Sequence, residues 1–211
     1  MNAEFAAFML RARALGGNVT PILRAMEGAD RRKYLTRDLG GSRYSNDLLP
    51  APCGQTTDRL DDLVRLVSAA DLAPEYRVLE IGTGTGFLTA ILAELADHVV
   101  TLERYRTLLD RARTVHAENG IRNVTYRQAD GGNPEAIEGT FDRIVSSVAF
   151  RTEPKAFISR LSVEGVLVLP IGDPTGPQTI YRLQKVGLRF ERTVIGEGWF
   201  PPIERGIALA L

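Results

Sequence analysis

Short apolar runs alternate with amphipathic stretches from residue 77 to residue 171, and this alternation restricts the fold more than any other feature. The apolar runs cover residues 78–81, 98–102, 124–128, 143–147 and 166–171. Between them, residues 87–96, 105–119 and 154–161 carry apolar side chains three or four positions apart, which predicts helices. Strands that alternate with helices pair in parallel through right-handed crossovers. We therefore expect a doubly wound α/β core.

The two ends of the chain follow other patterns. Residues 179–186, 190–196 and 207–211 are consecutive strand-like runs with glycine- and proline-containing turns, so the sheet should finish antiparallel. Two short amphipathic helices are predicted before residue 27. We expect residues 1–76 to form N-terminal helices and a lid-like arm (residues 27–57), and residues 77–211 to form one compact core.

A helix is predicted from about residue 59 to Ala70, with Leu63, Val64, Leu66 and Val67 as its apolar stripe. Thr57 or Asp58 is the predicted N-cap, because both residue types accept hydrogen bonds from the free N–H groups of a helix start.

Charge and cysteine content narrow the class of protein. The 211 residues contain 26 basic and 26 acidic side chains, so the basic field typical of nucleic-acid-binding proteins is absent. The basic residues between Arg31 and Arg43 are expected to form a solvated face. Apolar runs stay far below the roughly 20 residues that span a bilayer. Arg11 and Arg13 interrupt the N-terminal apolar stretch, and the single Cys53 cannot form an internal disulfide. A cytoplasmic protein is expected.

Three glycines at alternate positions, Gly82, Gly84 and Gly86, lie between a buried strand and a helix start. Such a turn lets the backbone approach a ligand. Glu103 follows 21 residues after Gly82, close to the spacing of about 20 expected for an acid that binds ribose hydroxyls. The spacing G-x-G-x-G differs from the G-x-G-x-x-G pattern that is typical of dinucleotide-binding turns. A phosphate-binding P-loop is excluded as well, because no Gly-Lys-Ser/Thr sequence follows the glycines. Glu80 is an acid close to the turn, so it favours a cationic ligand. S-adenosyl-L-methionine is a cationic ligand that also contains ribose.

The run from Glu80 to Phe87 resembles the first motif of class I methyltransferases, and specifically of the protein-L-isoaspartate O-methyltransferase family. Residues 54–57 (Gly-Gln-Thr-Thr) resemble the family's Gly-Gln-Thr-Ile, and residues 129–131 (Ala-Asp-Gly) its Gly-Asp-Gly. Residues 141–145 and 165–172 resemble its fourth and fifth strands, and residues 200–203 its closing Phe-Val-Pro-Leu. The resemblance extends from about residue 10 to residue 205.

This resemblance implies a mostly parallel, seven-stranded Rossmann-like sheet and transfer of a methyl group from S-adenosyl-L-methionine to a carboxylate in a protein or peptide, above all an L-isoaspartyl residue. It also implies roles: the glycine turn lies against the methionine moiety, Glu103 binds the ribose, and Asp130 faces the adenine, although Asp130 alone could be a turn residue. The candidate cofactor-binding residues are Gln55, Thr56, Glu80, Gly82, Thr83, Gly84, Gly86, Glu103, Arg104, Asp130 and Gly131.

The chain departs from the family where the acceptor is expected. The family continues Gly-Gln-Thr-Ile with Ser-Gln-Pro, and that serine meets the substrate carboxylate, whereas Thr57 and Asp58 precede Arg59 here. Thr57 and Asp58 are the candidate catalytic residues. An ionised Asp58 facing an acceptor carboxylate would cost about 4 kcal/mol at a separation of about 4 Å and an effective dielectric constant near 20.

Three alternatives follow for Asp58. It caps the helix while Thr57 supplies the hydroxyl, it is protonated, or the acceptor is not isoaspartate. Arg59 could instead pair with an acceptor carboxylate and partly cancel the charge of Asp58. Two other functions are open besides isoaspartyl methylation: methyl transfer to another acceptor, such as a small metabolite or a modified peptide, or binding of the cofactor without transfer of a methyl group.

The remaining residues of chemically reactive or ligand types are expected to have mainly structural roles. Residues 146–149 should line the acceptor side. Cys53 is expected to be a lone buried cysteine. His98 and His116 lie too far from other ligand-type residues to suggest a metal site, so one should start a strand and the other should face solvent on a helix. No metal is expected.

Overall fold

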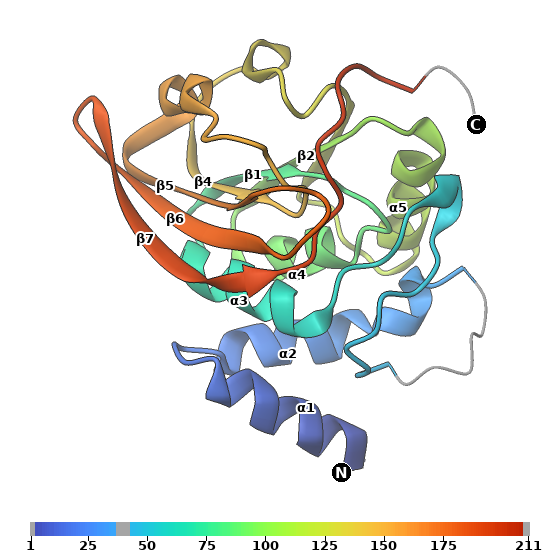
Figure 1. Cartoon of the computed structure of the whole chain (residues 1–211). Coiled ribbons are helices and arrows are strands. Elements are labelled where there is room, and N and C mark those ends of the chain that lie inside the picture. Colours follow the sequence, from blue (N-terminus) through green and yellow to red (C-terminus); the bar gives the residue numbers. More distant parts are fainter. Residues whose placement is uncertain (1–2, 37–42, 209–211) are drawn as a thin grey trace.

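The computed structural model describes residues 3–36 and 43–208, and its central element is a seven-stranded sheet with the order β3-β2-β1-β4-β5-β6-β7 (Figure 1). The five strands β1–β5 pair in parallel, and β6 and β7 are antiparallel, as the sequence predicts. The strands are β1 (Arg77–Ile81), β2 (His98–Glu103), β3 (Val124–Gln128), β4 (Phe141–Ser146), β5 (Leu161–Ile171), β6 (Gln178–Val186) and β7 (Arg189–Gly198).

Within the described residues, five α-helices and four short 3-10 helices accompany the sheet. The α-helices are α1 (Ala3–Ala14), α2 (Thr20–Ala29), α3 (Leu60–Ala70), α4 (Phe87–Leu95) and α5 (Arg106–Glu118). The 3-10 helices are η1 (Arg31–Tyr34), η2 (Pro52–Gly54), η3 (Pro134–Ala136) and η4 (Lys155–Arg160). None of the helices in the described ranges has the length and apolar character needed to cross a bilayer.

The core has two buried clusters, one on each face of the sheet. Val78 belongs to the cluster that also contains side chains of α1–α4, whereas its neighbour Leu79 belongs to the other cluster, because successive side chains of a strand point to opposite faces. The second face is covered by irregular chain and by η4. The expected helix at residues 154–161 is therefore only a six-residue 3-10 helix, since β5 begins at Leu161 directly after it.

The start of α3 corrects the predicted N-cap. Arg59 occupies that position, and no side chain of Thr57 or Asp58 caps the helix. Instead, Asn46 accepts a hydrogen bond from the backbone N–H of Asp61 through its Oδ1 at 3.0 Å. The arm thus supplies the capping oxygen from 15 residues upstream, and the helix ends at Ala70 as predicted.

Three further expectations were wrong. His116 is fully buried instead of facing solvent, Cys53 is only half-buried and has a φ of 61°, and Arg31 is 3% exposed instead of solvated. His98 begins β2 as expected. Residues 207 and 208 do not form the predicted strand; residues 209–211 of that run and residues 37–42 of the arm lie outside the described residues.

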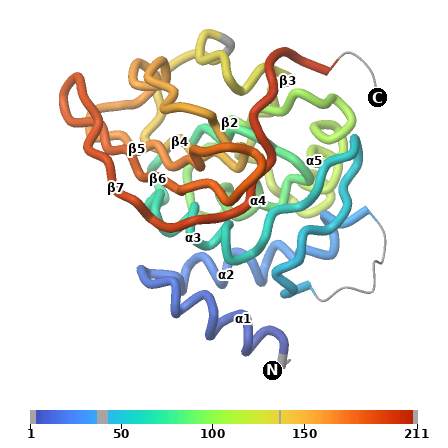
Figure 2. The backbone as a smooth tube through the Cα atoms, in the orientation of Figure 1, coloured from blue at the N-terminus to red at the C-terminus, as the bar shows by residue number. Residues whose placement is uncertain are grey.

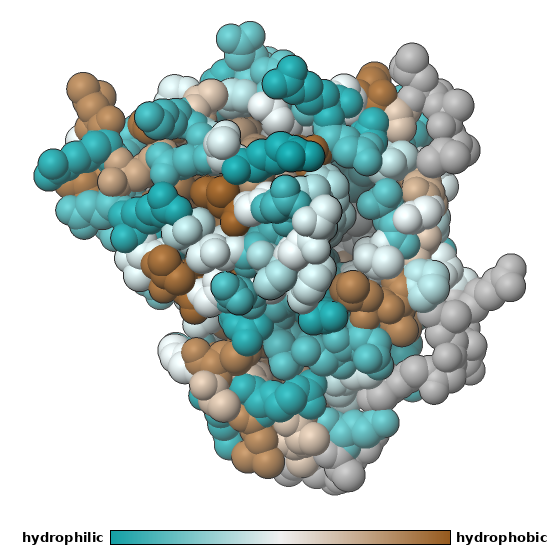
Figure 3. Space-filling model, in the orientation of Figure 1, coloured by the Kyte–Doolittle hydropathy of each residue, from teal (hydrophilic) through white to brown (hydrophobic). Residues whose placement is uncertain are grey.

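After β7 the chain runs back along the carboxyl edge of the sheet toward β3, which we call the C-terminal segment (residues 199–208) (Figure 2). Pro202 forms a bridge with Ala149, and Ala208 donates its N–H to the carbonyl of Arg104 at 3.0 Å. At the opposite end of the sheet, apolar side chains show at the tip of the β6–β7 hairpin, where Leu188 is 96% exposed (Figure 3). The C-terminal segment therefore crosses the edge where the predicted site residues gather.

Candidate active site

A cavity opens at the carboxyl edge of β1, β2 and β4, with about 890 Å³ of space free of protein atoms, part of it open to solvent. Open α/β sheets bind ligands at this edge, where the strand order reverses between β1 and β4. Eight of the predicted site residues line the cavity, namely Gln55, Thr56, Asp58, Gly82, Gly84, Glu103, Arg104 and Gly131. The other five, namely Thr57, Glu80, Thr83, Gly86 and Asp130, lie beside or below it.

The three glycines of the turn serve different purposes, although all have positive φ angles of 96°, 53° and 92°. A Cβ on Gly82 would lie 2.9 Å from the Ser147 hydroxyl, and one on Gly86 would lie 2.8 Å from the Cβ of Ala112. A Cβ on Gly84 would meet nothing within 4 Å. The first and third glycines therefore allow close packing, and Gly84 leaves open space for a ligand.

Glu103 joins the glycine turn to the second strand. Its Oε2 accepts a hydrogen bond from the N–H of Gly84 at 2.9 Å, and its Oε1 accepts one from the N–H of Tyr105 at 3.0 Å. Burial raises the pKa of this carboxyl, and the backbone donors oppose that rise. Since each carboxylate oxygen can accept a second hydrogen bond, Glu103 can receive a pair of hydroxyl groups from the cavity.

Glu80 lies beneath the turn and does not line the cavity. Its Oε2 accepts hydrogen bonds from the hydroxyls of Thr89 at 2.6 Å and Thr101 at 2.5 Å, and the hydroxyl of Thr83 lies 2.6 Å from that of Thr101. Burial raises the pKa of Glu80 to about 8. A neutral Glu80 and Thr83 thus support the floor of the turn.

His116 on α5 holds the far end of the same turn. Its Nε2 lies 2.9 Å from the carbonyl oxygen of Gly86, and its Nδ1 lies 2.7 Å from the Tyr126 hydroxyl. Burial lowers the pKa of this imidazole. His116 therefore holds the turn in place, and its role could not be inferred from the sequence because its two partners lie in the glycine turn and in β3, which are both separate from α5.

A second wall comes from the acceptor loop (residues 55–58). The hydroxyl of Thr57 faces away from the cavity and is hydrogen-bonded to Arg31 Nη2 and to the N–H of Leu49, both at 3.1 Å. Asp58, in contrast, lines the cavity, and burial raises the pKa of its carboxyl to about 7 against the opposing charge of Arg31. The structure thus separates the two predicted catalytic residues.

Arg31 fixes the acceptor loop from behind. Its guanidinium donates hydrogen bonds to the carbonyl oxygens of Ser45 at 2.8 Å, Asp47 at 3.4 Å and Asp58 at 2.9 Å, in addition to the hydroxyl of Thr57. One buried side chain therefore joins two parts of the arm to the residue that faces the cavity.

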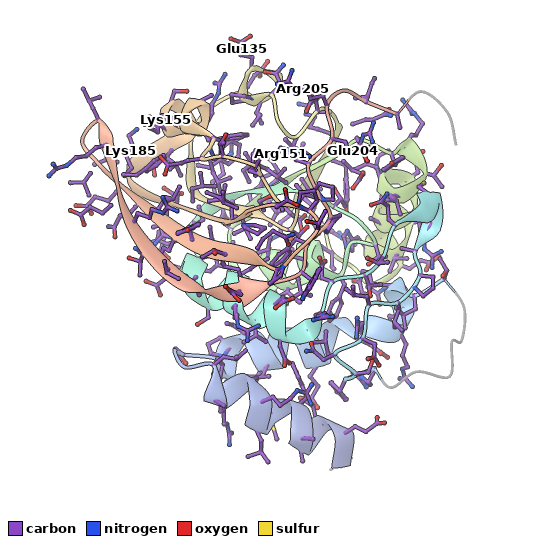
Figure 4. The ribbon with its side chains drawn as sticks, viewed as in Figure 1. Glu135, Arg151, Lys155, Lys185, Glu204 and Arg205 are labelled. Carbon is purple, nitrogen blue, oxygen red and sulfur yellow. The ribbon has the colours of Figure 1, made fainter. Side chains whose placement is uncertain are left out.

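The C-terminal segment forms the third wall through Pro201, Pro202, Ile203 and Glu204. Glu204 forms an ion pair with Arg104, and it lies next to the exposed Arg205 on this segment (Figure 4). Asp130 Oδ2 accepts a hydrogen bond from the N–H of Gly206 at 2.7 Å, and its Oδ1 accepts one from Gly132 at 2.8 Å. Asp130 thus holds a turn and this segment, while Gly131 lines the cavity.

Sequence reasoning missed the apolar and aromatic part of the lining. Tyr105 and Leu108 follow Glu103 and line the cavity, as do Ile81, Leu102 and Ala129. The Tyr105 hydroxyl lies 3.5 Å from the amide nitrogen of Gln55, so it also touches the acceptor loop. An aromatic residue two positions after the acid was the available signal. No group of three potential metal-ligating side chains occurs among the described residues.

Comparisons with known proteins agree on one family. The family model described as protein-L-isoaspartate(D-aspartate) O-methyltransferase matches residues 7–204. A protein-L-isoaspartate O-methyltransferase of Rhodopseudomonas palustris (strain BisA53) is 36% identical over 204 residues, which cover 97% of this chain and 95% of the relative. The enzyme of Rhizobium meliloti (strain 1021) is 36% identical over 199 residues, covering 94% and 98%.

Solved structures support the fold. A Plasmodium falciparum protein described as a protein-L-isoaspartate O-methyltransferase, in complex with S-adenosyl-L-homocysteine, has a TM-score of 0.79 at 19% identity and covers 97% of this chain and 99% of that one. Another structure named protein-L-isoaspartate O-methyltransferase has a TM-score of 0.82 at 21% identity, covering 96% and 67%. On the family match and the 36% identical relatives, the chain belongs to the protein-L-isoaspartate O-methyltransferase family.

Proposed function

We propose that the protein transfers the methyl group of S-adenosyl-L-methionine to the side-chain carboxylate of an L-isoaspartyl residue in a damaged protein or peptide. Membership of the family supports this activity. The main structural support is a single continuous cavity, which joins Glu103 and the open side of Gly84 to the acceptor loop at Thr56 and Asp58.

The cavity fits the cofactor by the chemistry of its lining. Glu103 would hold the ribose hydroxyls, and Gly82 and Gly84 would lie against the methionine part, with open space at Gly84. Apolar side chains next to Gly131, such as Ala129 and Leu108, would receive the adenine. When bound, the cofactor supplies an activated methyl group. Gln55, Thr56 and Arg104 would complete the polar contacts.

The chain itself needs to do little proton chemistry. An isoaspartyl carboxyl has a pKa near 4 and is already ionised at neutral pH, so no base is required to activate it. The remaining tasks are to align the acceptor oxygen with the methyl group and to exclude water. Pro201, Pro202 and Val148 form an apolar side of the cavity that suits the second task.

Formation of S-adenosyl-L-homocysteine with an isoaspartyl peptide tests this function, with the same peptide containing ordinary aspartate as the control. We expect turnover with the first peptide alone. Asp58 in place of the family's serine favours one second candidate, a methyltransferase with a different acceptor. Methylation of other peptides or metabolites, but not of the isoaspartyl peptide, would support that candidate. The single cysteine remains the reason to expect a reducing, cytoplasmic setting.

A further inference from the structure

Asp58 lines the acceptor side of the cavity, and its carboxyl group interacts with the charges of Arg31 and Asp62. Its backbone carbonyl is bound by Arg31, but its side chain makes no hydrogen bond to another of the residues that the structure describes. It also does not cap α3, whose N-cap is Arg59. Asp58 therefore brings to the wall that is proposed to receive the acceptor a carboxyl group that makes no hydrogen bond to another described residue.

The surroundings of Asp58 disfavour its ionised form. Its charged neighbours are three acids and three bases, and one of the bases, Arg31, already divides its donors among three carbonyl oxygens and one hydroxyl. Desolvation is the largest effect on its pKa. The charged groups around this wall are Arg31 on η1, Arg59 and Asp62 at the start of α3, Glu80 on β1, and Glu103 and Arg104 after β2.

On the basis of the function proposed above, we propose that Asp58 binds the acceptor carboxylate as a protonated acid, so that the two carboxyl groups share one proton. Two carboxylates in contact cannot both stay ionised, because each raises the other's pKa. The Asp58 O–H group then donates a hydrogen bond to one acceptor oxygen, as the serine hydroxyl would. The pair keeps a single negative charge on the acceptor, so its other oxygen remains a nucleophile.

The chemical step stays balanced. A bond forms between the free acceptor oxygen and the methyl carbon while the bond from that carbon to the sulfonium sulfur breaks, and the electron pair of the broken bond goes to sulfur. The acceptor becomes a neutral ester, and the proton remains on Asp58. The proton therefore acts in binding and orientation and is not consumed.

The arrangement makes acceptor binding depend on pH. Above pH 7, Asp58 is increasingly ionised in the free enzyme, and binding an ionised acceptor requires uptake of a proton from solution. The apparent affinity for the acceptor falls with the fraction of protein that is protonated at Asp58. Binding of the cofactor does not require a protonated Asp58.

The decisive measurement is the KM for an isoaspartyl peptide between pH 5.5 and pH 9, for the wild type, Asp58→Asn and Asp58→Ser. Both variants keep a hydrogen-bond donor that does not ionise in this range. We expect the wild-type KM to rise by about tenfold per pH unit above pH 7, and the KM of both variants to change by less than about threefold. Binding of S-adenosyl-L-homocysteine should be independent of pH in all three proteins and confirms that each is folded.

Calorimetry gives a readout that does not depend on turnover. At pH 8, with S-adenosyl-L-homocysteine bound, peptide binding to the wild type should take up close to one proton, seen as a heat that varies with the ionisation enthalpy of the buffer. Asp58→Asn should take up none. A wild-type KM that does not change with pH, or equal proton uptake in Asp58→Asn, would overturn the role of Asp58 and leave the proposed function standing. No methylation of the isoaspartyl peptide by any of the three proteins at any pH would overturn both.

Discussion

The two halves of the cavity are built in different ways. The cofactor half consists of the ends of β1 and β2 and the glycine turn, where neighbouring residues in the sequence contact the ligand space directly. The acceptor half consists of irregular chain from residues 44–58 and 199–208. Its position depends on a few long-range hydrogen bonds, above all those of Arg31. The first half is local in sequence, and the second is assembled from distant pieces.

This difference determines at which positions the sequence can change without loss of the site. In the cofactor half, neighbouring atoms leave no room for a side chain at Gly82 or Gly86. In the acceptor half, the residue that faces the cavity can differ, as Asp58 does, as long as the backbone behind it stays in place. Variants in the two halves should therefore fail in different ways.

The largest effect is expected from Arg31→Met, which breaks the acceptor half. The substitution removes the donor to the part-buried carbonyl oxygens of Ser45 and Asp58 and one of the two hydrogen bonds of the Thr57 hydroxyl, so we expect a loss of about 3–5 kcal/mol in the free energy of unfolding. Urea denaturation measures it. Arg32→Met is the matched control, because that side chain is 65% exposed and should change stability by less than about 0.5 kcal/mol. Equal effects of both substitutions would contradict the proposed role of Arg31.

Gly86→Ala tests the packing of the cofactor half. The added Cβ would lie 2.8 Å from the Cβ of Ala112 and 3.0 Å from the imidazole of His116, at a φ of 92°. We expect a loss of about 2–4 kcal/mol in stability. Gly84→Ala, at a φ of 53° with open space around it, should cost only about 1 kcal/mol. Thermal unfolding of the two variants compares them, and a more damaging Gly84→Ala would show that the open side is misplaced.

Glu103→Ala should affect the ligand more than the fold. Removing an acceptor of hydroxyl groups should weaken binding of S-adenosyl-L-homocysteine by about 1.5–3 kcal/mol, or roughly 10- to 150-fold. Calorimetric titration measures the affinity, with Glu118→Ala on the exposed end of α5 as the control. Unchanged affinity would remove Glu103 from the ribose site. Tighter binding of a nicotinamide dinucleotide than of S-adenosyl-L-methionine would exclude the cofactor class.

The smallest effect is expected for the rate of proteolysis of the arm (residues 27–57) when ligand is bound in the cavity. Its end already forms one wall of the cavity through Gln55 and Thr56. A bound ligand that contacts this wall should stabilise it, and proteolytic cleavage within the arm should slow by about two- to fivefold when S-adenosyl-L-homocysteine is saturating. Cleavage at an exposed site outside the arm is the control. The same rate with and without ligand would argue against a lid.

The sequence predicts the strands and the glycine turn of the cofactor half, because their signals are local. Buried parallel strands appear as apolar runs, and glycines at alternate positions mark the turn with its acid at the end of the next strand. The acceptor half is less predictable. Asn46 replaces Asp58 as the partner of the α3 N-terminus, and Arg31 lies in a basic run typical of a solvated surface. Both depend on contacts between residues at least 14 positions apart in the sequence, which no periodic pattern records.

The route of the C-terminal segment has a consequence for how the site comes into being. A chain that stopped at Gly198 would contain all seven strands and the complete glycine turn, but it would lack Pro201, Pro202, Ile203 and Glu204, which close one side of the cavity. The residues that make the sheet and the residues that close the cavity are therefore separate parts of the chain. Ligand binding can add its full free energy to the stability of the protein only when the C-terminal segment is in place against the carboxyl edge of the sheet.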